Sequence, residues 1–263
     1  MMSHFCSIKL CIVGVILIAS TKADLIKRQA DDDEVCNDAE SSAFMCFEYF
    51  KLSLQWPKAS CYRARVLSQS DKECNTPDSW SIHGLWPQTT RPNKSILKKK
   101  CPLDIPFNID DLNDIKDRLT PVWFGVDISG EGDPNAKLWE HEWTKHGRCA
   151  ARHKDLDSIG KFFSKTLELY DQYNIDQALN DRGISPGNTA SLGDISNAIK
   201  DMVRKLPRIS TISNKERTES YLYEIHICYD HDFDHVDCPE KAAEVTEPDK
   251  QIKYLKDVPS VTG

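Results

Sequence analysis

The chain has 263 residues, enough for one or two domains with a substantial hydrophobic core. It carries 34 Lys and Arg against 41 Asp and Glu, a formal net charge of −7 at pH 7. This balance argues against a protein that binds nucleic acid along a broad basic face. It still allows an enzyme that contacts one or two phosphates in a cleft, or one that works at acidic pH.

Residues 1–23 have the pattern of a signal peptide. An apolar run over 10–19 is followed by small residues that offer cleavage positions after Ser20 or Ala23. The run is shorter than the roughly 20 apolar residues that a membrane-spanning helix needs. The leader removes two lysines and no acid, leaving 32 basic and 41 acidic residues and a net charge of −9. We therefore expect a secreted protein with no membrane anchor.

Cysteine usage predicts a disulfide framework. Cys6 and Cys11 leave with the leader, and the even number that remains is typical of paired cysteines in an oxidising compartment. No close cysteine pair stands near a histidine pair at zinc spacing, which disfavours a structural zinc site. The eight remaining cysteines are Cys36, Cys46, Cys61, Cys74, Cys101, Cys149, Cys228 and Cys238.

Two strands are predicted early in the chain. Apolar and polar residues alternate over 50–56, as in a half-buried strand, and Pro57 ends the pattern. Residues 61–78 are polar with little periodicity and predict a loop. The stretch 80–86 predicts a second strand that stops at Pro87.

A basic, irregular stretch follows over 89–100 and predicts a solvated loop. It contains the only glycosylation sequon, at Asn93. Next, Asn108 or Asp110 is a candidate cap for a helix that carries apolar residues as far as Leu119. Residues 125–135 combine acids, glycines and a proline and predict another loop.

The second half of the chain is mainly helical, with one late strand. Helices are predicted over 137–147, 158–173, 175–179 and 191–206, the first stopping at Gly147. Alternation over 221–229 predicts the strand, and an acidic stretch follows it. Because strands and helices mix without a βαβ rhythm, we expect an α+β single domain over 36–240. Its mainly antiparallel sheet would pack against several helices and be stapled by disulfides. Polar tails are expected over 24–35, which could also be a pro-segment, and over 241–263.

The densest chemistry lies between Leu138 and Cys149. Zinc-binding helices of the His-Glu-x-x-His type place two histidines four residues apart, whereas His141 and His146 are five apart, about 140° around an α-helix. Helical spacing instead puts Glu142, Lys145 and His146 on one face, with His141 at its margin. This arrangement favours acid–base chemistry and anion stabilisation and disfavours a metal cage. Trp139 and Trp143 are one turn apart and are expected in the core.

Such a set suits phosphodiester transfer in RNA. The 2′-hydroxyl must lose a proton as it attacks, the 5′-oxygen must gain one as it leaves, and the phosphate oxygens accumulate charge. Histidine can act as base or acid at mildly acidic pH, and His83 supplies a second proton carrier from the early strand. No metal or other cofactor is required, because the nucleophile belongs to the substrate.

At these residues the chain resembles a known family. Ile82-His83-Gly84-Leu85-Trp86-Pro87 and the stretch from Trp139 to Cys149 are similar to the two active-site segments of the T2-type ribonucleases, which are secreted, lysosomal or vacuolar acid endoribonucleases. The resemblance implies cleavage of single-stranded RNA through 2′,3′-cyclic phosphates to 3′-phosphate ends. It also implies a secreted enzyme, with a lysosomal or vacuolar location as the alternative.

The resemblance assigns a role to each site residue. It implies that His146 is the general base on the 2′-hydroxyl and His83 the general acid for the leaving 5′-oxygen. His141 would bind the phosphate, and Glu142 and Lys145 would polarise it. Spacing alone does not distinguish the base from the acid.

Three further positions bear on substrate choice. Trp86 is a candidate for stacking on a base. Gln88 stands where the family often has Asp or Asn, so base preference stays open. Arg148 replaces a small Thr; it would either strengthen phosphate binding or point to solvent, and we favour solvent.

The same resemblance implies the disulfide pairs Cys61–Cys74, Cys101–Cys149 and Cys228–Cys238, which leaves Cys36–Cys46 as the fourth. The remaining histidines are expected to be ordinary polar residues: His153 and His226 without a site role, and His231 and His235 in a surface loop more readily than at a metal.

Single-stranded RNA is the expected partner of a monomeric enzyme. The rival hypothesis is a secreted glycoprotein that acts on other cells through a receptor, for example through a glycan on Asn93, with ribonuclease activity contributory or dispensable.

Overall fold

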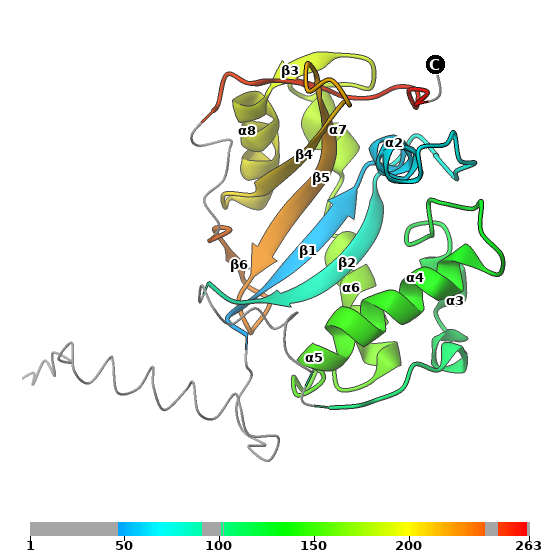
Figure 1. Cartoon of the computed structure of the whole chain (residues 1–263). Coiled ribbons are helices and arrows are strands. Elements are labelled where there is room, and N and C mark those ends of the chain that lie inside the picture. Colours follow the sequence, from blue (N-terminus) through cyan, green and yellow to red (C-terminus); the bar gives the residue numbers. More distant parts are fainter. Residues whose placement is uncertain (1–46, 91–100, 102, 240–246, 262–263) are drawn as a thin grey trace, which may run out of the picture. The chain divides into compact units, whose positions relative to one another are not determined.

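The computed structural model describes residues 47–90, 101, 103–239 and 247–261. In this part of the chain a mixed sheet runs in the order β2-β1-β5-β7-β3, and β4 and β6 also pair with β5 (Figure 1). Among the described strands, β5 and β7 alone pair in parallel, which confirms the predicted α+β fold with a mainly antiparallel sheet. The strands are β1 (Tyr49–Gln55), β2 (Ser81–Gln88), β3 (Thr189–Ser191), β4 (Arg208–Ser213), β5 (Ser220–Tyr229), β6 (His235–Val236) and β7 (Gln251–Lys253).

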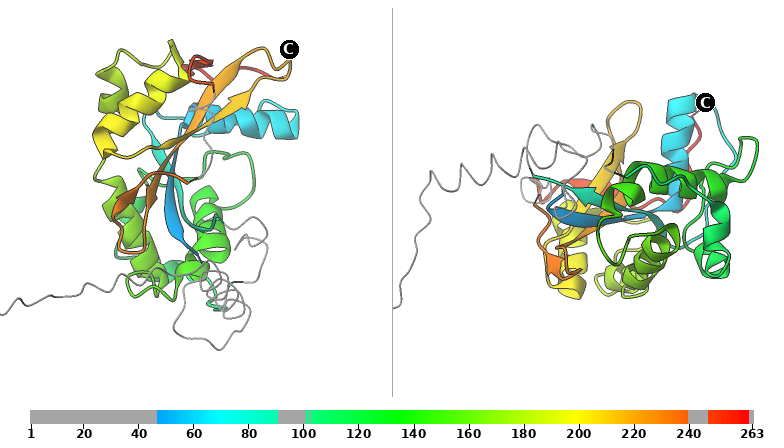
Figure 2. Two further views of the ribbon diagram at one scale, coloured as in Figure 1. Left: turned by 90° about the vertical axis from the view of Figure 1, so that its left-hand side faces the viewer. Right: turned by 90° about the horizontal axis from the view of Figure 1, so that it is seen from below.

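Helices cover both sides of this sheet. In both views of Figure 2, α6 and α8 lie on one side of it and α4 on the other. Phe162 and Phe163 of α6 are fully buried and fill the core beneath β1 and β2. The helices are α2 (Pro57–Ser68), η2 (Ile109–Leu112), α3 (Lys116–Leu119), α4 (Pro134–Glu142), η3 (Trp143–Gly147), α5 (Arg148–Ala150), α6 (Ile159–Tyr170), α7 (Ile175–Asn180) and α8 (Leu192–Val203).

β1 is buried on both faces, so the expectation of a half-buried strand is wrong. Leu52 and Leu54 point into the core, and the alternate residues Lys51 and Ser53 are also buried, at 8% and 0% exposure. The reason is position: β1 lies between β2 and β5 and is covered on either side. Its alternation separates a core face from a buried polar face, and that polar face contributes to the site described below.

The stretch 61–78, expected to be a loop, begins as the second half of α2. Pro57 occupies the first turn of this helix, where a proline costs no hydrogen bond, and Cys61 and Tyr62 lie on its buried side. The weak apolar periodicity hid a helix that buries only one short stripe. The strand at 80–86 also runs further than expected, because Pro87 pairs with Phe50 and β2 ends at Gln88. β2 is an edge strand, where a proline is tolerated.

The predicted helices differ mainly in their ends. The helix expected after Asn108 is divided into η2, capped by the Asn108 side chain, and α3. α6, α7 and α8 form as predicted, with Ser158, Asn174 and Ser191 as their side-chain caps. The late strand is β5, also as predicted.

The C-terminal segment differs from the expected polar tail. In its described part, β7 adds to the sheet, and Ile252, Tyr254 and Leu255 are buried. Two tryptophans bind it: Trp80 Nε1 donates to Tyr254 Oη, and Trp56 Nε1 donates to the Leu255 carbonyl, both at 2.8 Å. The apolar signal is only three residues long, too short to distinguish from a tail by periodicity.

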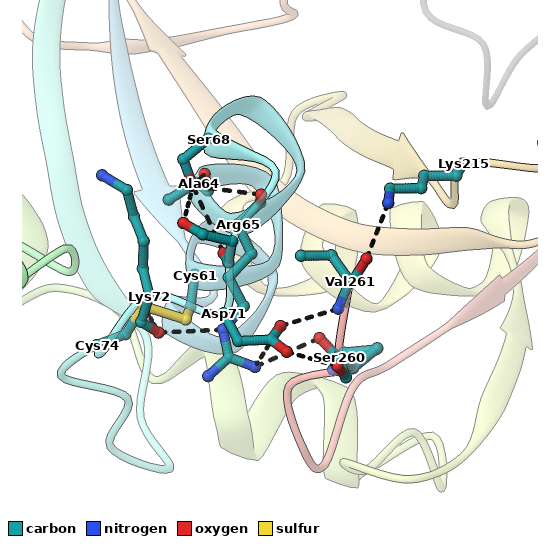
Figure 3. A network of polar contacts seen from close by, with 12 residues as sticks. Cys61, Ala64, Arg65, Ser68, Asp71, Lys72, Cys74, Lys215, Ser260 and Val261 are labelled. Atoms are coloured by element: carbon teal, nitrogen blue, oxygen red, sulfur yellow. Dashed lines mark hydrogen bonds and ion pairs between the residues drawn. A yellow bond between two sulfur atoms is a disulfide. The ribbon is translucent and has the colours of Figure 1, made fainter. Parts of the chain in front are cut away.

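Beyond β7 the chain is fastened to the loop that follows α2 (Figure 3). Asp71 accepts hydrogen bonds from the Ser260 hydroxyl at 2.6 Å and from the Val261 backbone N–H at 2.9 Å. Lys215 donates to the Val261 carbonyl at 2.8 Å. These contacts join the loop after α2, the loop between β4 and β5, and the C-terminal segment.

Three predicted disulfides are confirmed: Cys61–Cys74, Cys101–Cys149 and Cys228–Cys238. The signal peptide, the Cys36–Cys46 pair and the Asn93 sequon lie outside the described residues. Among the described residues, no helix has the length and apolarity needed to cross a membrane.

Candidate active site

His83 stands at a β-bulge in β2. Leu54 of β1 pairs with Ile82 and Ser53 pairs with Gly84, so His83 is an extra residue with no partner opposite. Side chains alternate along a strand, and an inserted residue changes which face the following side chains occupy. The bulge therefore keeps Ile82 in the core and places Trp86 on the polar face. The Trp123 indole N–H donates to the His83 carbonyl at 3.0 Å and fixes this backbone.

The polar face continues across the sheet. Ser53 of β1 is paired with His226 of β5, and Gln55 is paired with Glu224. Glu224 accepts hydrogen bonds from both flanking histidines: its Oε1 lies 2.5 Å from His83 Nδ1 and its Oε2 lies 3.0 Å from His226 Nε2. Both Glu224 and His226 are buried.

The histidine-rich segment is a helix with a π turn. It runs through α4, η3 and α5, and Gly147 lies inside it with helical φ and ψ of −57° and −51°. The prediction that Gly147 ends the helix is therefore wrong. Glycine is required there for packing, because an added Cβ would lie 2.5 Å from Trp143 Cε3 and 3.1 Å from Phe162 Cδ1.

The π turn also changes which side chains meet. It closes over five residues, so positions five apart come onto one side. Nitrogen or oxygen atoms of His141, Glu142 and His146 all lie within 4.8 Å of one another. The estimate of 140° between His141 and His146, which assumed a regular α-helix, is wrong. Lys145 is exposed beside this group, whereas Glu142 and His146 are buried. Trp139 and Trp143 are in the core as expected.

Trp86 joins the two motifs. Its indole Nε1 donates to Glu142 Oε2 at 2.8 Å, and its ring centroid lies 5.0 Å from that of His83 and 5.3 Å from that of His146. Lys51 Nζ lies 5.4 Å from the same ring. The Trp86 ring thus contacts both candidate acid–base histidines, His83 and His146.

The two opposed histidines have opposite electrostatic environments. Burial, followed by the charges of His141, His83, Lys51 and Lys145, lowers the pKa of His146 to about 3. Burial would also lower the pKa of His83, but the hydrogen bond to Glu224 and the charge of Glu224 outweigh burial and raise it. Of these two histidines, His146 is therefore neutral and His83 protonated at mildly acidic pH.

The carboxyl groups of the site are also separated in pKa. Burial raises the pKa of Glu142 to about 7, against a smaller lowering by His83 and Trp86. Burial would raise the pKa of Glu224 as well, but the hydrogen bonds from His226 and His83 hold it well below its usual range. Glu142 Oε1 and His146 Nδ1 are buried and have no hydrogen-bond partner among the described residues.

The comparison with known proteins decides the family. The sequence model described as the Ribonuclease T2 family matches residues 47–238, which include both motifs and the whole site. The chain belongs to the Ribonuclease T2 family. It is a T2-type endoribonuclease, as the two motifs predicted.

Relatives support this over most of their length. The chain is 32% identical to Ribonuclease Oy of Magallana gigas over 212 residues, which cover 78% of this chain and 94% of that protein. It is 31% identical to ribonuclease T2 of Sus scrofa over 196 residues, which cover 73% of this chain and 89% of that protein. Human RNase T2 is similar in structure with a TM-score of 0.63 and 26% identity, covering 80% of this chain and 98% of that one. Ribonuclease MC1 from bitter gourd seeds is similar in structure with a TM-score of 0.60 and 27% identity, covering 73% of this chain and 94% of that one.

This T2 ribonuclease has a groove of about 430 Å³ beside His83. Gln55 and Tyr223 of the sheet, Arg63 and Leu67 of α2, and Val126 contribute to its walls. Arg63 lies with its guanidinium carbon 5.9 Å from the Tyr223 ring centre. His83 thus lies between the cluster of His141, Glu142 and His146 and this groove.

Other predicted positions of the ribonuclease are placed as follows. Gln88 is half-buried at the end of β2, and its carbonyl accepts from Glu48 N–H at 2.7 Å. Arg148 neither joins the expected phosphate-binding side chains nor points freely to solvent. Its Nε donates to the Thr144 carbonyl at 2.7 Å and its Nη1 to Asp104 at 2.6 Å.

Three residues near the site were missed or dismissed at the level of sequence. Glu224 was not considered, and His226 was expected to have no site role, yet together they hold His83. Lys51 was seen only as the polar half of an alternation. The available signal was the polar positions of the two predicted strands, which pairing brings to one face. Of the other histidines, His153 donates through Nε2 to the His231 carbonyl at 2.7 Å, and His235 Nε2 lies 2.5 Å from the Tyr173 hydroxyl.

Proposed function

We propose that this T2 ribonuclease is secreted and cleaves single-stranded RNA by metal-independent acid–base transesterification. The 2′-oxygen of the substrate attacks phosphorus, the bond to the 5′-oxygen breaks, and the resulting 2′,3′-cyclic phosphate is hydrolysed to a 3′-phosphate. The observation that carries the proposal is the pair of histidines in one site with oppositely shifted pKa values. Such a separation is how one site supplies both a base and an acid.

His146 suits the general base. A base must be unprotonated at the working pH, and burial keeps the pKa of His146 near 3. It would take the proton of the 2′-hydroxyl as the new P–O bond forms. His146 is only 8% exposed, so bound substrate would also shield it from water.

His83 suits the general acid. An acid must hold its proton, and Glu224 raises the pKa of His83. It would give that proton to the leaving 5′-oxygen. The groove beside His83 provides the space into which the departing nucleoside can extend.

His141, Lys145 and Glu142 would bind the phosphate. Lys145 and His141 are the exposed basic side chains beside Glu142 and His146. Burial and the charges of His83 and Lys145 lower the pKa of His141, so His141 gains its positive charge only as the pH becomes acidic. Glu142, with a pKa of about 7, carries a proton at acidic pH. Its Oε2 is held by Trp86 and its Oε1 has no described partner. A neutral carboxyl can donate a hydrogen bond to a phosphoryl oxygen as negative charge develops there.

The chemistry of the cluster favours phosphate over a metal ion. Lys145 and Lys51 are close enough to lower the pKa of His146, so the site already has positive potential. That potential opposes a dication and attracts a phosphate. A variant of RNase MC1, 28% identical to this chain, has been crystallised with 5′-UMP, which supports nucleotide binding here.

Secretion and a monomeric state are parts of the proposal. The 1–23 leader supports export, and T2 ribonucleases are in general secreted, vacuolar or lysosomal. Trp86 and Gln88 are retained as candidate base contacts. No observation in the described residues favours the receptor-mediated alternative.

The test is product analysis on dinucleoside phosphates with EDTA present. We expect 2′,3′-cyclic phosphates first and 3′-phosphates later, with undiminished rates in EDTA. The pH profile of kcat/KM should be bell-shaped, rising as His146 loses its proton and falling as His83 loses its own. His146→Ala should lower kcat at least about 10³-fold. Loss of activity in EDTA, or 5′-phosphate products, would overturn the proposal.

A further inference from the structure

Glu224 is a buried acid that the proposed reaction does not use directly. It lies in the middle of β5, is 5% exposed, and does not border the groove beside His83 in the way Gln55 and Tyr223 do. A buried carboxylate is costly unless it is paired, and Glu224 is paired twice, with His83 and His226. Its position therefore calls for an explanation through those partners.

The geometry on His83 leaves one ring nitrogen for chemistry. Nδ1 is 2.5 Å from Glu224 Oε1, so the proton on Nδ1 is directed at a carboxylate. The other nitrogen, Nε2, is then the one that can exchange a proton with substrate. A histidine whose one nitrogen is held by a carboxylate has a fixed ring orientation and a fixed tautomer when neutral.

We propose that Glu224 is a positioning residue that holds His83 in the orientation and protonation state of the general acid. His226 extends the arrangement: its Nε2 bonds to Glu224 Oε2, so the carboxylate cannot turn away from His83. The inference rests on the proposed role of His83 as the acid. Glu224 does not touch the reacting atoms and acts only through His83.

The surrounding charges favour this reading of the contact. His83 faces Glu224 from β5, Glu142 from α4 and Arg63 from α2, and the histidines His141 and His146, whose pKa values are both lowered, lie on the Trp86 side of the site. Of these, Glu224 is the one in hydrogen-bond contact with the ring. On its far side Glu224 is bordered by His226, which in turn faces Lys51 and Arg208. Glu224 is thus an anion enclosed by groups that bear or can bear positive charge.

The discriminating experiment changes the leaving group of the substrate. A dinucleoside phosphate expels an alkoxide that needs a proton, whereas a nucleoside 3′-(4-nitrophenyl phosphate) expels a stable phenolate that does not. A residue that acts only through the general acid should matter for the first substrate and not for the second. The ratio of the two rates in one preparation does not depend on how much of the protein is folded.

For Glu224→Gln we expect kcat on the dinucleoside phosphate to fall about 10- to 100-fold, a part of the roughly 10²–10⁴-fold effect of one proton transfer. On the nitrophenyl substrate the loss should be below about 3-fold, and KM should change little on either, because the substitution leaves the acid present but misdirected. The basic limb of the profile on the dinucleoside phosphate should move to lower pH, because Glu224 is what raises the pKa of His83. Glu142 also titrates there, so the leaving-group comparison is the primary readout.

Two variants calibrate the result. Glu219→Gln is the matched control: Glu219 precedes β5 and pairs with Lys253 at the surface, so both rates should stay unchanged. His83→Ala should lose at least about 10³-fold on the dinucleoside phosphate and far less on the nitrophenyl substrate.

The outcomes separate the two levels of the argument. If His83→Ala loses equally on both substrates, His83 is not the acid and the proposed function fails at that residue. If His83→Ala discriminates between the substrates and Glu224→Gln loses equally on both, or on neither, the positioning role of Glu224 is overturned while the proposed function stands.

Discussion

Trp86 Nε1 donates a hydrogen bond to Glu142 Oε2 at 2.8 Å and so connects the β2 motif to the π-turn helix. The contact explains why a tryptophan is useful at this point irrespective of base stacking. It leaves Glu142 Oε1 as the only oxygen of that carboxyl without a described partner. One carboxyl oxygen is thus fixed by the protein and the other is left for the substrate.

Trp86→Phe should lower kcat about 10-fold while leaving the fold intact. Phenylalanine keeps an aromatic ring beside His83 and His146 but removes the donor that orients Glu142. Steady-state kinetics on a dinucleoside phosphate measure the effect, with thermal unfolding as a check. Trp80→Phe is the matched control, because Trp80 bonds to Tyr254 in the core and should lose stability without losing kcat. An unchanged kcat in Trp86→Phe would remove the orienting role.

The sequence predicted the chemistry of this site better than its geometry. Residue identity and motif order pointed to His83, His141, Glu142, Lys145 and His146, and the family resemblance implied the three disulfides that the described residues contain. Two local irregularities were invisible, the bulge at His83 and the π turn at 143–147, because each depends on packing against distant residues. With 3.6 residues per turn, His141 and His146 were expected about 140° apart. The π turn instead brings their ring nitrogens within 4.8 Å of each other.

The pairing of residues between strands was the second feature that the sequence could not predict. The alternation of β1 and that of β5 were both predicted, but nothing local says that Gln55 pairs with Glu224 or Ser53 with His226. Without that register, the polar positions of each strand looked like solvent-facing residues. The structure makes them one buried polar face, where Glu224 and His226 support His83.

Gly84→Ala should disturb the contact between Trp86 and Glu142. A Cβ at Gly84 would overlap Glu142 Oε2 and Trp86 Nε1, so the hydrogen bond between them must lengthen or break. We expect kcat to fall about 10-fold or more and the free energy of unfolding to fall by about 1–3 kcal/mol, as for overpacked sites. Gly130→Ala is the control, since its added Cβ would meet nothing closer than Lys137 Nζ at 3.7 Å. Wild-type kinetics in Gly84→Ala would contradict the close approach.

Glu142→Gln should change the pH dependence of stability in a defined direction. Burial raises the pKa of Glu142 to about 7 from an ordinary 4.5, so its contribution to stability is fully present below pH 4.5 and is lost as pH rises through 7. Glutamine cannot ionise and escapes this loss. The difference in unfolding free energy, mutant minus wild type, should therefore become more favourable by about 1–3 kcal/mol between pH 4 and pH 8.

His146 titrates in the opposite sense, since its pKa is lowered to about 3, and it destabilises the fold as pH drops below 6.5. It is present in both proteins, so it cancels in the difference. Denaturant unfolding at pH 4, 6 and 8 provides the measurement. Glu219→Gln, at an exposed carboxyl, should show no such gain. A difference that is flat with pH would mean that Glu142 is not ionising from a buried state.

Tyr254→Ala tests whether the C-terminal segment is part of the core, as the structure has it, or a polar tail, as the sequence predicted. Tyr254 is 1% exposed, and its hydroxyl accepts from Trp80 Nε1. Removing the ring leaves a cavity and an unpaired indole N–H, so we expect the free energy of unfolding to fall by about 3–5 kcal/mol. Lys256→Ala, two residues further on and exposed, should change it by less than about 0.5 kcal/mol. A tail would give the same small effect for both, because truncating a solvated side chain removes no buried contact.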